Sequence, residues 1–242
     1  MSKKQKVFCI GLSRTGTVSI CEALEILGYR TIHFSPAIFL NQNIIDSNLT
    51  FSSKQNLSFF KNLDFKREVK AYNHKFDKDI LEKNDAFGDL PFPLFYKELD
   101  RKYPGSKFIY TFRDEEKWLK SMKWLYEEGA ILWLHGYVDD EIKFAAYNSF
   151  KYDRQKLLRS YRSHHKDVKE YFKNRPNDIL MLNIDAQKVT FNPLCEFLNE
   201  VRPEVAYPHS NAAKKASLKK QINYKLMRSI PLYSAVKNKM GF

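Results

Sequence analysis

A glycine loop near the N-terminus constrains the fold of this chain more than any other stretch. The segment GLSRTGTVSI (residues 11–20) begins at the end of the apolar run VFCIGL (residues 7–12) and leads into a stretch where Ile20, Leu24 and Leu27 recur at helical spacing. A strand, a glycine turn and a helix in this order form an anion site, because backbone N–H groups and the positive end of the helix dipole point to one place. The sequence therefore predicts a phosphate-binding loop at the start of an α/β fold.

The loop differs from that of nucleoside triphosphatases at two positions. Thr17 stands where the motif G-x-x-x-x-G-K-[ST] has its lysine, and Val18 stands at the position of the magnesium-binding hydroxyl. Arg14 brings a positive charge from another place in the loop. We therefore expect this loop to bind phosphate without a metal. Its candidate ligands are Arg14, Thr15, Gly16, Thr17, Val18 and Ser19.

Predicted strands alternate with predicted helices, which favours a doubly wound, mostly parallel sheet. The first strand is expected at residues 6–12 and its helix at 17–27. Later strands are expected at 29–34, 85–91, 107–113 and 178–184. Ligands of such sheets bind beyond the carboxyl ends of the strands, which is where Gly11, His33, Asp89 and Arg113 fall.

A single domain is expected over residues 1–212, with lid or substrate-facing insertions near 36–76 and 123–150. The segment 213–242 is rich in lysine and has apolar residues at four-residue spacing, which indicates a basic amphipathic helix. A terminal helix docked on the domain is favoured over a membrane-surface or oligomer contact.

Arg113 and Ser121 form a second candidate anion site. Arg113 ends a predicted strand, and Ser121 lies two turns into the following helix, with Lys117 on the same face. Asp114 is expected to cap this helix, with Glu115 and Glu116 in its first turn. Two phosphate sites at neighbouring strand ends indicate a nucleotide that is phosphorylated at two positions.

Charge and composition narrow the class of partner. The 242 residues carry a formal net charge of +13, so we expect an anionic partner. The basic residues are dispersed and no nucleic-acid-binding motif is present, which argues against RNA or DNA. No apolar run approaches the roughly 20 residues that span a bilayer, and the chain begins without a signal-peptide pattern. With only three scattered cysteines, we expect a cytoplasmic protein of unknown oligomeric state.

Three blocks of the sequence resemble the sulfotransferases that use 3'-phosphoadenosine-5'-phosphosulfate (PAPS). The loop SRTGTVS is similar to the G-R-T-G-T-x-S of one branch of this family. The stretch GDLPFPLFYKELDRKYPGSKFIYTFRDEEKWLKS resembles the second block of that branch, and PLCEFLNEVRPEVAYPHSN resembles a third. Together the blocks cover most of residues 6–125 and 155–212.

The resemblance implies a P-loop-like parallel sheet flanked by helices. It also implies an enzyme that transfers a sulfuryl group from PAPS to a hydroxyl or amine of a small-molecule acceptor, without a metal. The product would be adenosine 3',5'-bisphosphate. Arg14 to Ser19 would bind the 5'-phosphosulfate, and Arg113 and Ser121 the 3'-phosphate. Many members have lysine in place of Arg14, and the basic C-terminal loop of cytosolic members has no clear copy here.

Two residues compete as the base that takes the acceptor's proton. Asp89 lies in D-L-P, a segment that resembles the H-L-P of cytosolic relatives, and it is the first choice. A carboxylate with a pKa of about 4 is nevertheless a weak base for an alcohol. His33 ends the second predicted strand, and histidine titrates nearer to neutral pH. Arg14 is expected to stabilise charge on the leaving oxygen.

Two functions of other classes remain open at this stage. A P-loop kinase or triphosphatase would need magnesium-dependent ATP binding, which the missing lysine disfavours. A non-catalytic nucleotide- or nucleic-acid-binding protein would share the positive charge but would need no base. The aromatic residues between positions 124 and 147 also have two possible roles, since they suit either the core or an acceptor pocket.

Overall fold

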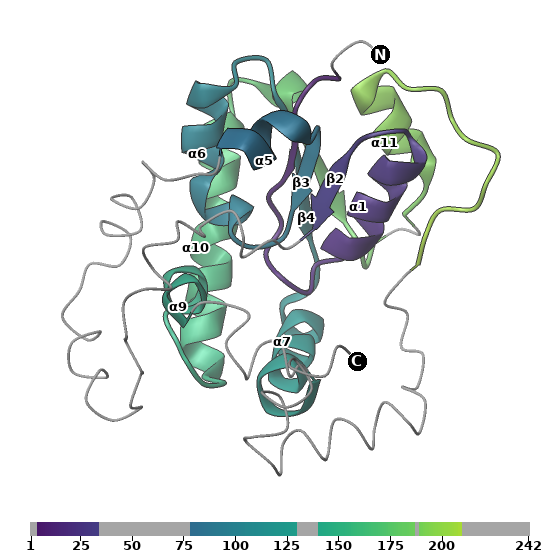
Figure 1. Cartoon of the computed structure of the whole chain (residues 1–242). Helices are drawn as coiled ribbons and strands as arrows, with labels where there is room; N and C mark the ends of the chain where they lie inside the picture. The colour runs from purple at the N-terminus through teal and green to yellow at the C-terminus, as the bar shows by residue number, and fades with distance from the viewer. Residues whose placement is uncertain (1–3, 34–77, 130–139, 187–188, 210–242) are drawn as a thin grey trace, which may run out of the picture.

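The computed structural model describes residues 4–33, 78–129, 140–186 and 189–209. Its centre is a five-stranded sheet with the order β2-β3-β1-β4-β5, in which every pair of neighbours is parallel. The strands are β1 (Val7–Cys9), β2 (Thr31–His33), β3 (Ala86–Gly88), β4 (Lys107–Phe112) and β5 (Ile179–Asn183). This confirms the predicted α/β class, with a parallel sheet flanked by helices (Figure 1).

Helices lie on both sides of this sheet and beyond its carboxyl edge. The α-helices are α1 (Thr17–Ile26), α5 (Lys78–Lys83), α6 (Phe92–Lys102), α7 (Glu115–Trp124), α9 (Asp140–Tyr147), α10 (Arg154–Phe172) and α11 (Phe191–Leu198). A π-helical turn, η3 (Leu125–Gly129), continues α7, and a 3-10 turn, η4 (Pro176–Asp178), precedes β5.

Alternate residues of β1 and its extension face two different helical layers. Val7 and Cys9 pack with α1 and α11, whereas Phe8 and Ile10 pack with α6 and α10. Figure 1 shows these two pairs of helices on opposite sides of the sheet. A parallel strand that is buried on both faces has a continuous apolar sequence. This explains why the run VFCIGL predicted the strand.

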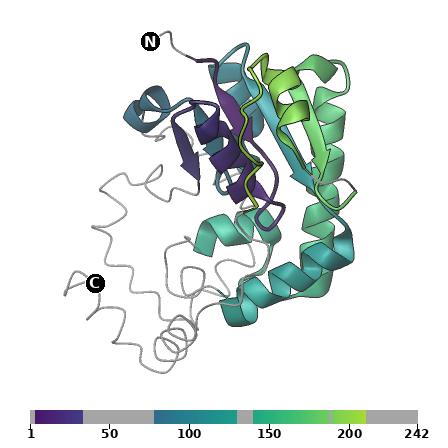
Figure 2. The same ribbon diagram turned by 90° about the vertical axis from the view of Figure 1, so that its right-hand side faces the viewer.

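A third apolar cluster lies beyond the carboxyl ends of the strands. Trp118 of α7, Tyr147 of α9 and Tyr161 of α10 pack there with Leu12 and Leu90 from the loops after β1 and β3. Figures 1 and 2 show α7 and α9 set below the strand tips rather than against a face of the sheet. These helices therefore bring their polar side chains to the loops at the carboxyl edge.

The observed elements are shorter than the predicted ones. The strand predicted over 85–91 ends at Gly88, because Asp89 takes a left-handed conformation with φ 64°. The described residues of the region 123–172 include the end of α7, η3, α9 and α10. The predicted insertion at 36–76 and the segment 213–242 lie outside the described residues, so the proposed domain boundaries stay predictions.

Candidate functional site

The carboxyl edge of the sheet brings the predicted site residues together. In the sheet register Cys9 pairs with both Gly88 and Ile109, and His33 pairs with Gly88. The loops after β1, β3 and β4 therefore leave the sheet side by side, and the end of β2 lies next to β3. Gly11, His33, Asp89 and Arg113 all lie at this edge, as expected for a parallel sheet.

The loop between β1 and α1 has the backbone shape of an anion-binding nest. Arg14 and Gly16 both have positive φ angles, of 71° and 88°. Gly16 is the N-cap of α1, and no side chain caps this helix end. Helix geometry leaves the first amides of α1, including those of Thr17 and Val18, without an intrahelical acceptor. Such amides, together with the helix dipole, attract an anion.

The threonines of this loop serve its own structure. Thr15 is fully buried, and both its N–H and its hydroxyl donate to the carbonyl of Leu12, at 3.2 and 2.7 Å. Its hydroxyl also lies 2.8 Å from that of Thr111 on β4. The buried hydroxyl of Thr17 turns toward His33 and Asp89. Val18 and Ser19 are half-buried in the first turn of α1.

Arg14 reaches across to α7. Its Nε donates to the hydroxyl of Ser121 at 2.9 Å, and its guanidinium carbon lies 5.0 Å from the ring centre of Trp124. Trp124 is 42% exposed. Burial lowers the pKa of Arg14, Asp89 opposes this effect, and the positive charge of Arg113 adds to it. Ser121, predicted as a partner of Arg113, thus contacts Arg14 directly.

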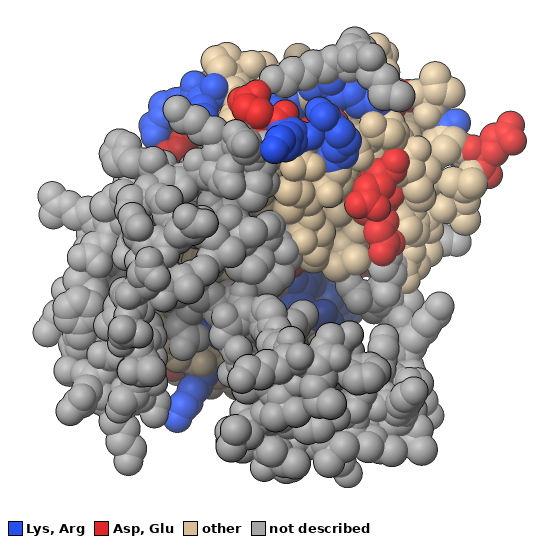
Figure 3. Space-filling model, viewed as in Figure 1, with Lys and Arg blue, Asp and Glu red and all other residues tan. Residues whose placement is uncertain are grey.

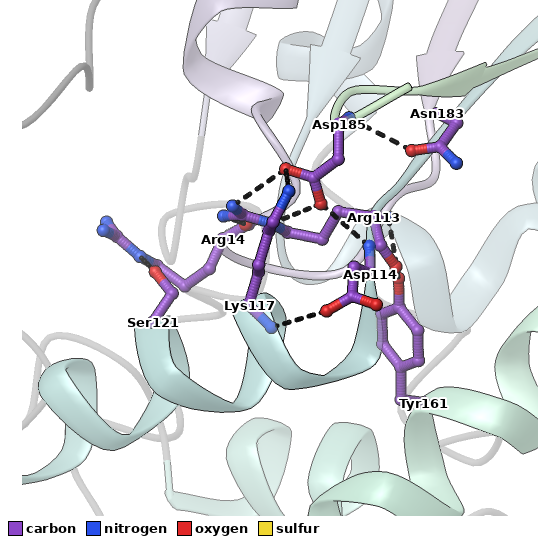
Figure 4. Close-up of polar contacts among 8 residues, drawn as sticks. All are labelled: Arg14, Arg113, Asp114, Lys117, Ser121, Tyr161, Asn183 and Asp185. Carbon is purple, nitrogen blue, oxygen red and sulfur yellow. Dashed lines mark hydrogen bonds and ion pairs between the residues drawn. The ribbon is translucent and has the colours of Figure 1, made fainter. Parts of the chain in front are cut away.

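Hydrogen bonds fix both the backbone and the side chain of Arg113. The Tyr161 hydroxyl accepts from the N–H of Arg113 at 2.9 Å and donates to its carbonyl at 2.8 Å. The guanidinium donates to the Asp185 carboxylate from Nε at 3.4 Å and from Nη2 at 3.2 Å, and Nη1 donates to the Arg14 carbonyl at 3.4 Å. Figure 4 shows Asp185 lying between Arg113 and Lys117, with Arg14 and Ser121 beside them. The two predicted anion sites therefore adjoin each other, and we refer to this cluster of Arg14, Arg113, Lys117 and Ser121 as the cleft.

The two candidate bases lie in one hydrogen-bonded cluster. His33 Nε2 is 3.5 Å from Asp89 Oδ2, and the Thr17 hydroxyl lies 3.1 Å from that nitrogen and 3.2 Å from that oxygen. Asp89 Oδ1 accepts from the Ser13 hydroxyl at 2.6 Å and from the Leu90 N–H at 2.7 Å. The side chain of His33 is 28% exposed, compared with 12% for Asp89. The histidine is thus the outer member of the pair.

Two aromatic residues that the sequence did not assign to the loop fix its first turn. The hydroxyl of Tyr147 accepts from the Ser13 N–H at 3.1 Å, and Trp118 Nε1 donates to the Ser13 carbonyl at 3.0 Å. Both side chains are fully buried. Burial, reinforced by the charge of Asp89, raises the pKa of Tyr147 well above its usual range. Within the stretch expected to be core or acceptor pocket, Tyr147 therefore belongs to the core, while positions 130–139 lie outside the described residues.

Positively charged side chains are visible at this level of the molecule. In the space-filling view from the side of Figure 1, Lys and Arg atoms are set back at the height where Figure 1 draws the loop above α7 (Figure 3).

Among the described residues, no group of three or more His, Cys, Asp or Glu side chains could hold a metal ion. No helix in the described part of the chain is long and apolar enough to cross a membrane.

Comparison with known proteins gives matches of three kinds. A family model described as "Sulfotransferase domain" matches residues 6–216. "Ava biosynthesis cluster protein M" from Aspergillus versicolor is 26% identical over 229 residues, which cover 84% of this chain and 80% of that protein. A solved sulfotransferase from Alicyclobacillus acidocaldarius gives a TM-score of 0.44 at 15% identity, covering 96% of this chain and 95% of that one. The family match includes every residue of the cleft and of the base cluster.

Proposed function

Since the chain belongs to the sulfotransferase domain family, we propose that it transfers a sulfuryl group from PAPS to a hydroxyl or amine of a small-molecule acceptor, without a metal. The observation that supports this most is the joined cleft. Arg14, Arg113 and Lys117 converge there with the Ser121 hydroxyl and the first amides of α1. Cations grouped around two adjoining anion sites suit a ligand that carries anionic groups at two places.

The chemistry of these donors fits PAPS, which when bound supplies the sulfuryl group. Arg14 and the amides of residues 16–19 would hold its 5'-phosphosulfate, while Arg113 and Ser121 would hold its 3'-phosphate. Thr15 would shape the loop, since its N–H and hydroxyl are both engaged by Leu12. By analogy with phosphoryl transfer, the reaction depends on positioning and on stabilising charge at the leaving oxygen, the role that we assign to Arg14.

We assign the role of base to His33 and the role of its partner to Asp89. The Asp89 carboxylate already accepts from Ser13, from the Leu90 N–H and from Thr17, so three of its roughly four lone-pair positions are engaged. His33 is more exposed, and its Nε2 faces Asp89 and Thr17, which leaves Nδ1 to take a proton from the acceptor. A carboxylate beside a histidine favours one tautomer and stabilises the cation formed in the reaction, as in hydrolase triads.

Thermal-shift titration tests the proposed nucleotide. We expect adenosine 3',5'-bisphosphate to raise the melting temperature without metal, because a ligand that binds only the folded state stabilises it. Arg113→Ala should remove most of this shift. Arg154→Ala is a matched control, because Arg154 is an exposed arginine that pairs with Glu116 on α7 outside the cleft. Stabilisation by ATP with magnesium, and none by the bisphosphate, would instead support a kinase or triphosphatase.

Turnover distinguishes an enzyme from a protein that only binds the nucleotide. Release of adenosine 3',5'-bisphosphate from PAPS should increase with a suitable phenol, alcohol or amine in an acceptor panel. We further propose a cytoplasmic enzyme with its catalytic domain in residues 1–212 and a basic segment in 213–242. The family match, which ends at residue 216, supports that division.

A further inference from the structure

Asp185 is a negative charge inside the proposed anion cleft. It follows β5, whose pairing with β4 sets Asn183 opposite Phe112. The Ile184 N–H donates to the Phe112 carbonyl at 2.9 Å, and the Asp185 N–H donates to Asn183 Oδ1 at 3.0 Å. This turn places the Asp185 carboxylate directly beside Arg113 (Figure 4).

The carboxylate contacts donors on three residues. Besides the two bonds from Arg113, it accepts from the Asp114 N–H at 2.8 Å and lies 3.6 Å from Lys117 Nζ. Its side chain is 16% exposed. Burial opposes ionisation of Asp185, but the Asp114 N–H and the charges of Arg113 and Lys117 outweigh it, so the pKa of Asp185 lies below its ordinary value. Asp185 is therefore ionised where a negatively charged ligand is expected to bind.

Its contacts define the part of Arg113 that remains for a ligand. A guanidinium carries five N–H donors in a fixed plane. Asp185 takes one on Nε and one on Nη2, and the Arg14 carbonyl takes one on Nη1. One donor on each terminal nitrogen remains, which is the pair that can bind two oxygens of one phosphate.

Asp185 also balances repulsion within the cleft. Arg14, Arg113 and Lys117 lie close together, and the charge of Arg113 contributes to the lowered pKa of Arg14. A fixed carboxylate between Arg113 and Lys117 keeps both cations in place before a ligand arrives. Tyr161 holds the Arg113 backbone from the other side. A site arranged in advance loses less free energy on binding.

We propose that Asp185 is a positioning residue for the 3'-phosphate: by holding Arg113 and Lys117 it gives the cleft its preference for a 3'-phosphorylated adenosine nucleotide. This inference rests on the proposed function. It differs from a competing possibility, in which the carboxylate occupies the phosphate position and must be displaced by the ligand.

Calorimetric titration with two nucleotides separates these possibilities. Wild type, Asp185→Asn and Asp185→Glu would each be titrated with adenosine 3',5'-bisphosphate and with adenosine 5'-monophosphate, which lacks the 3'-phosphate. Loss of one charged hydrogen-bond partner should raise the bisphosphate Kd of Asp185→Asn by about tenfold and change the monophosphate Kd by less than about twofold. Asp185→Glu, which keeps the charge, should recover part of the loss. In an Arg113→Ala background, Asp185→Asn should have no further effect.

Asp153→Asn is the charge-matched control, because Asp153 caps α10 through the Lys156 N–H outside the cleft, and it should leave both Kd values unchanged. The proposal is overturned if Asp185→Asn binds the bisphosphate equally well or more tightly, the latter being the result expected of a competing carboxylate. Equal losses for both nucleotides would also overturn it, since they indicate general damage to the fold. If wild type does not bind the bisphosphate at all, the proposed function itself is wrong.

Discussion

His33 Nε2 lies 3.5 Å from Asp89 Oδ2, at the ends of the neighbouring parallel strands β2 and β3. The Thr17 hydroxyl is within 3.2 Å of both atoms. Thr17 is also the first residue of α1, whose N-terminus forms the proposed anion nest. One hydroxyl therefore links the proposed base to the proposed donor site. A substitution at either site should therefore alter the geometry of the other.

Replacing His33 by alanine should abolish most turnover and leave nucleotide binding intact. Loss of a general base reduces rates by about 10²- to 10⁴-fold. A histidine base must be neutral to accept a proton, so wild-type kcat/KM should fall at acidic pH. His33→Ala should lose this acidic limb. The measurement is nucleotide release from PAPS between pH 5.5 and 8.5.

Asp89→Asn is the companion variant, because it keeps an oxygen that can accept from the Leu90 N–H but removes the charge beside His33. It should lower kcat less than His33→Ala and keep an acidic limb in the pH profile. Full activity in His33→Ala, together with no activity in Asp89→Asn, would make Asp89 the base.

Arg14→Ala should lower both kcat and donor affinity, because Arg14 is assigned to charge that grows on the leaving oxygen. Removal of one such donor typically reduces kcat by about 10²- to 10³-fold. Arg14→Lys keeps the charge but loses the Nε bond to Ser121 and much of the planar contact with Trp124, so it should be intermediate. Steady-state kinetics with PAPS as the varied substrate would show this order. An Arg14→Lys variant as poor as Arg14→Ala would mean that geometry, rather than charge, is essential.

Local patterns were sufficient to predict the elements that carry the site. The apolar run before Gly11 predicted β1, and the acidic residues at 114–116 predicted the start of α7, where the Asp114 side chain accepts from the Lys117 N–H at 3.0 Å. The end of a strand follows from such short-range signals. The sequence therefore placed His33 and Asp89 correctly at the carboxyl edge.

Contacts between distant segments could not be predicted in the same way. That His33 and Asp89 form a pair depends on β2 lying next to β3, and strand order is a tertiary property. Asp185 meets Arg113 across 72 positions because β5 pairs with β4. The only signal in the sequence was an acid one residue beyond the last strand, which has the ordinary interpretation of a strand end. Tyr147 reaches Ser13 through the docking of α9, which periodicity does not encode.

Gly11→Ala should destabilise the fold strongly. An added Cβ at position 11 would lie 2.1 Å from Thr111 Oγ1 and 2.6 Å from the Thr111 carbonyl oxygen, so β4 or the loop would have to move. Overpacking of this kind costs about 1–3 kcal/mol in the free energy of unfolding. Gly105→Ala is the control: it has a φ of 81° but nothing within 4 Å, and should cost about 1 kcal/mol. Urea unfolding of both variants would test the difference, and equal losses would exclude the close approach as the cause.

Asp85→Asn should reduce stability at neutral pH and have less effect in acid. The buried Asp85 accepts from Arg30 Nε and Nη2, both at 2.7 Å, and these bonds lower the pKa of Asp85 below its ordinary value. A carboxyl with a depressed pKa in the folded state stabilises fully above its unfolded pKa of about 4. This stabilisation is lost as the pH falls through the lower, folded value. The difference in unfolding free energy between wild type and Asp85→Asn should therefore narrow below about pH 4; a constant difference would show that packing, not ionisation, is lost.

Tyr161→Phe should weaken nucleotide binding, because it removes the hydrogen bonds that fix the backbone of Arg113. Burial raises the pKa of Tyr161 to about 12, so its hydroxyl keeps its proton and can donate to the Arg113 carbonyl while it accepts from the Arg113 N–H. Phenylalanine keeps the ring that packs on Trp118, with ring centres 4.3 Å apart, but leaves both backbone groups of Arg113 without this partner. We expect a loss of about 1–3 kcal/mol in the free energy of unfolding and a higher Kd for adenosine 3',5'-bisphosphate.

Tyr110→Phe provides the matched control for Tyr161→Phe. Tyr110 is similarly buried, and its hydroxyl bonds to His165 Nδ1 at 3.1 Å rather than to a residue of the cleft. Removing that hydroxyl should also reduce stability but leave the Kd for the bisphosphate unchanged. Calorimetric titration of both variants at a temperature where each is fully folded separates the two effects. If Tyr110→Phe raised the Kd as much as Tyr161→Phe, the hydroxyl of Tyr161 would act through overall stability and not through the position of Arg113.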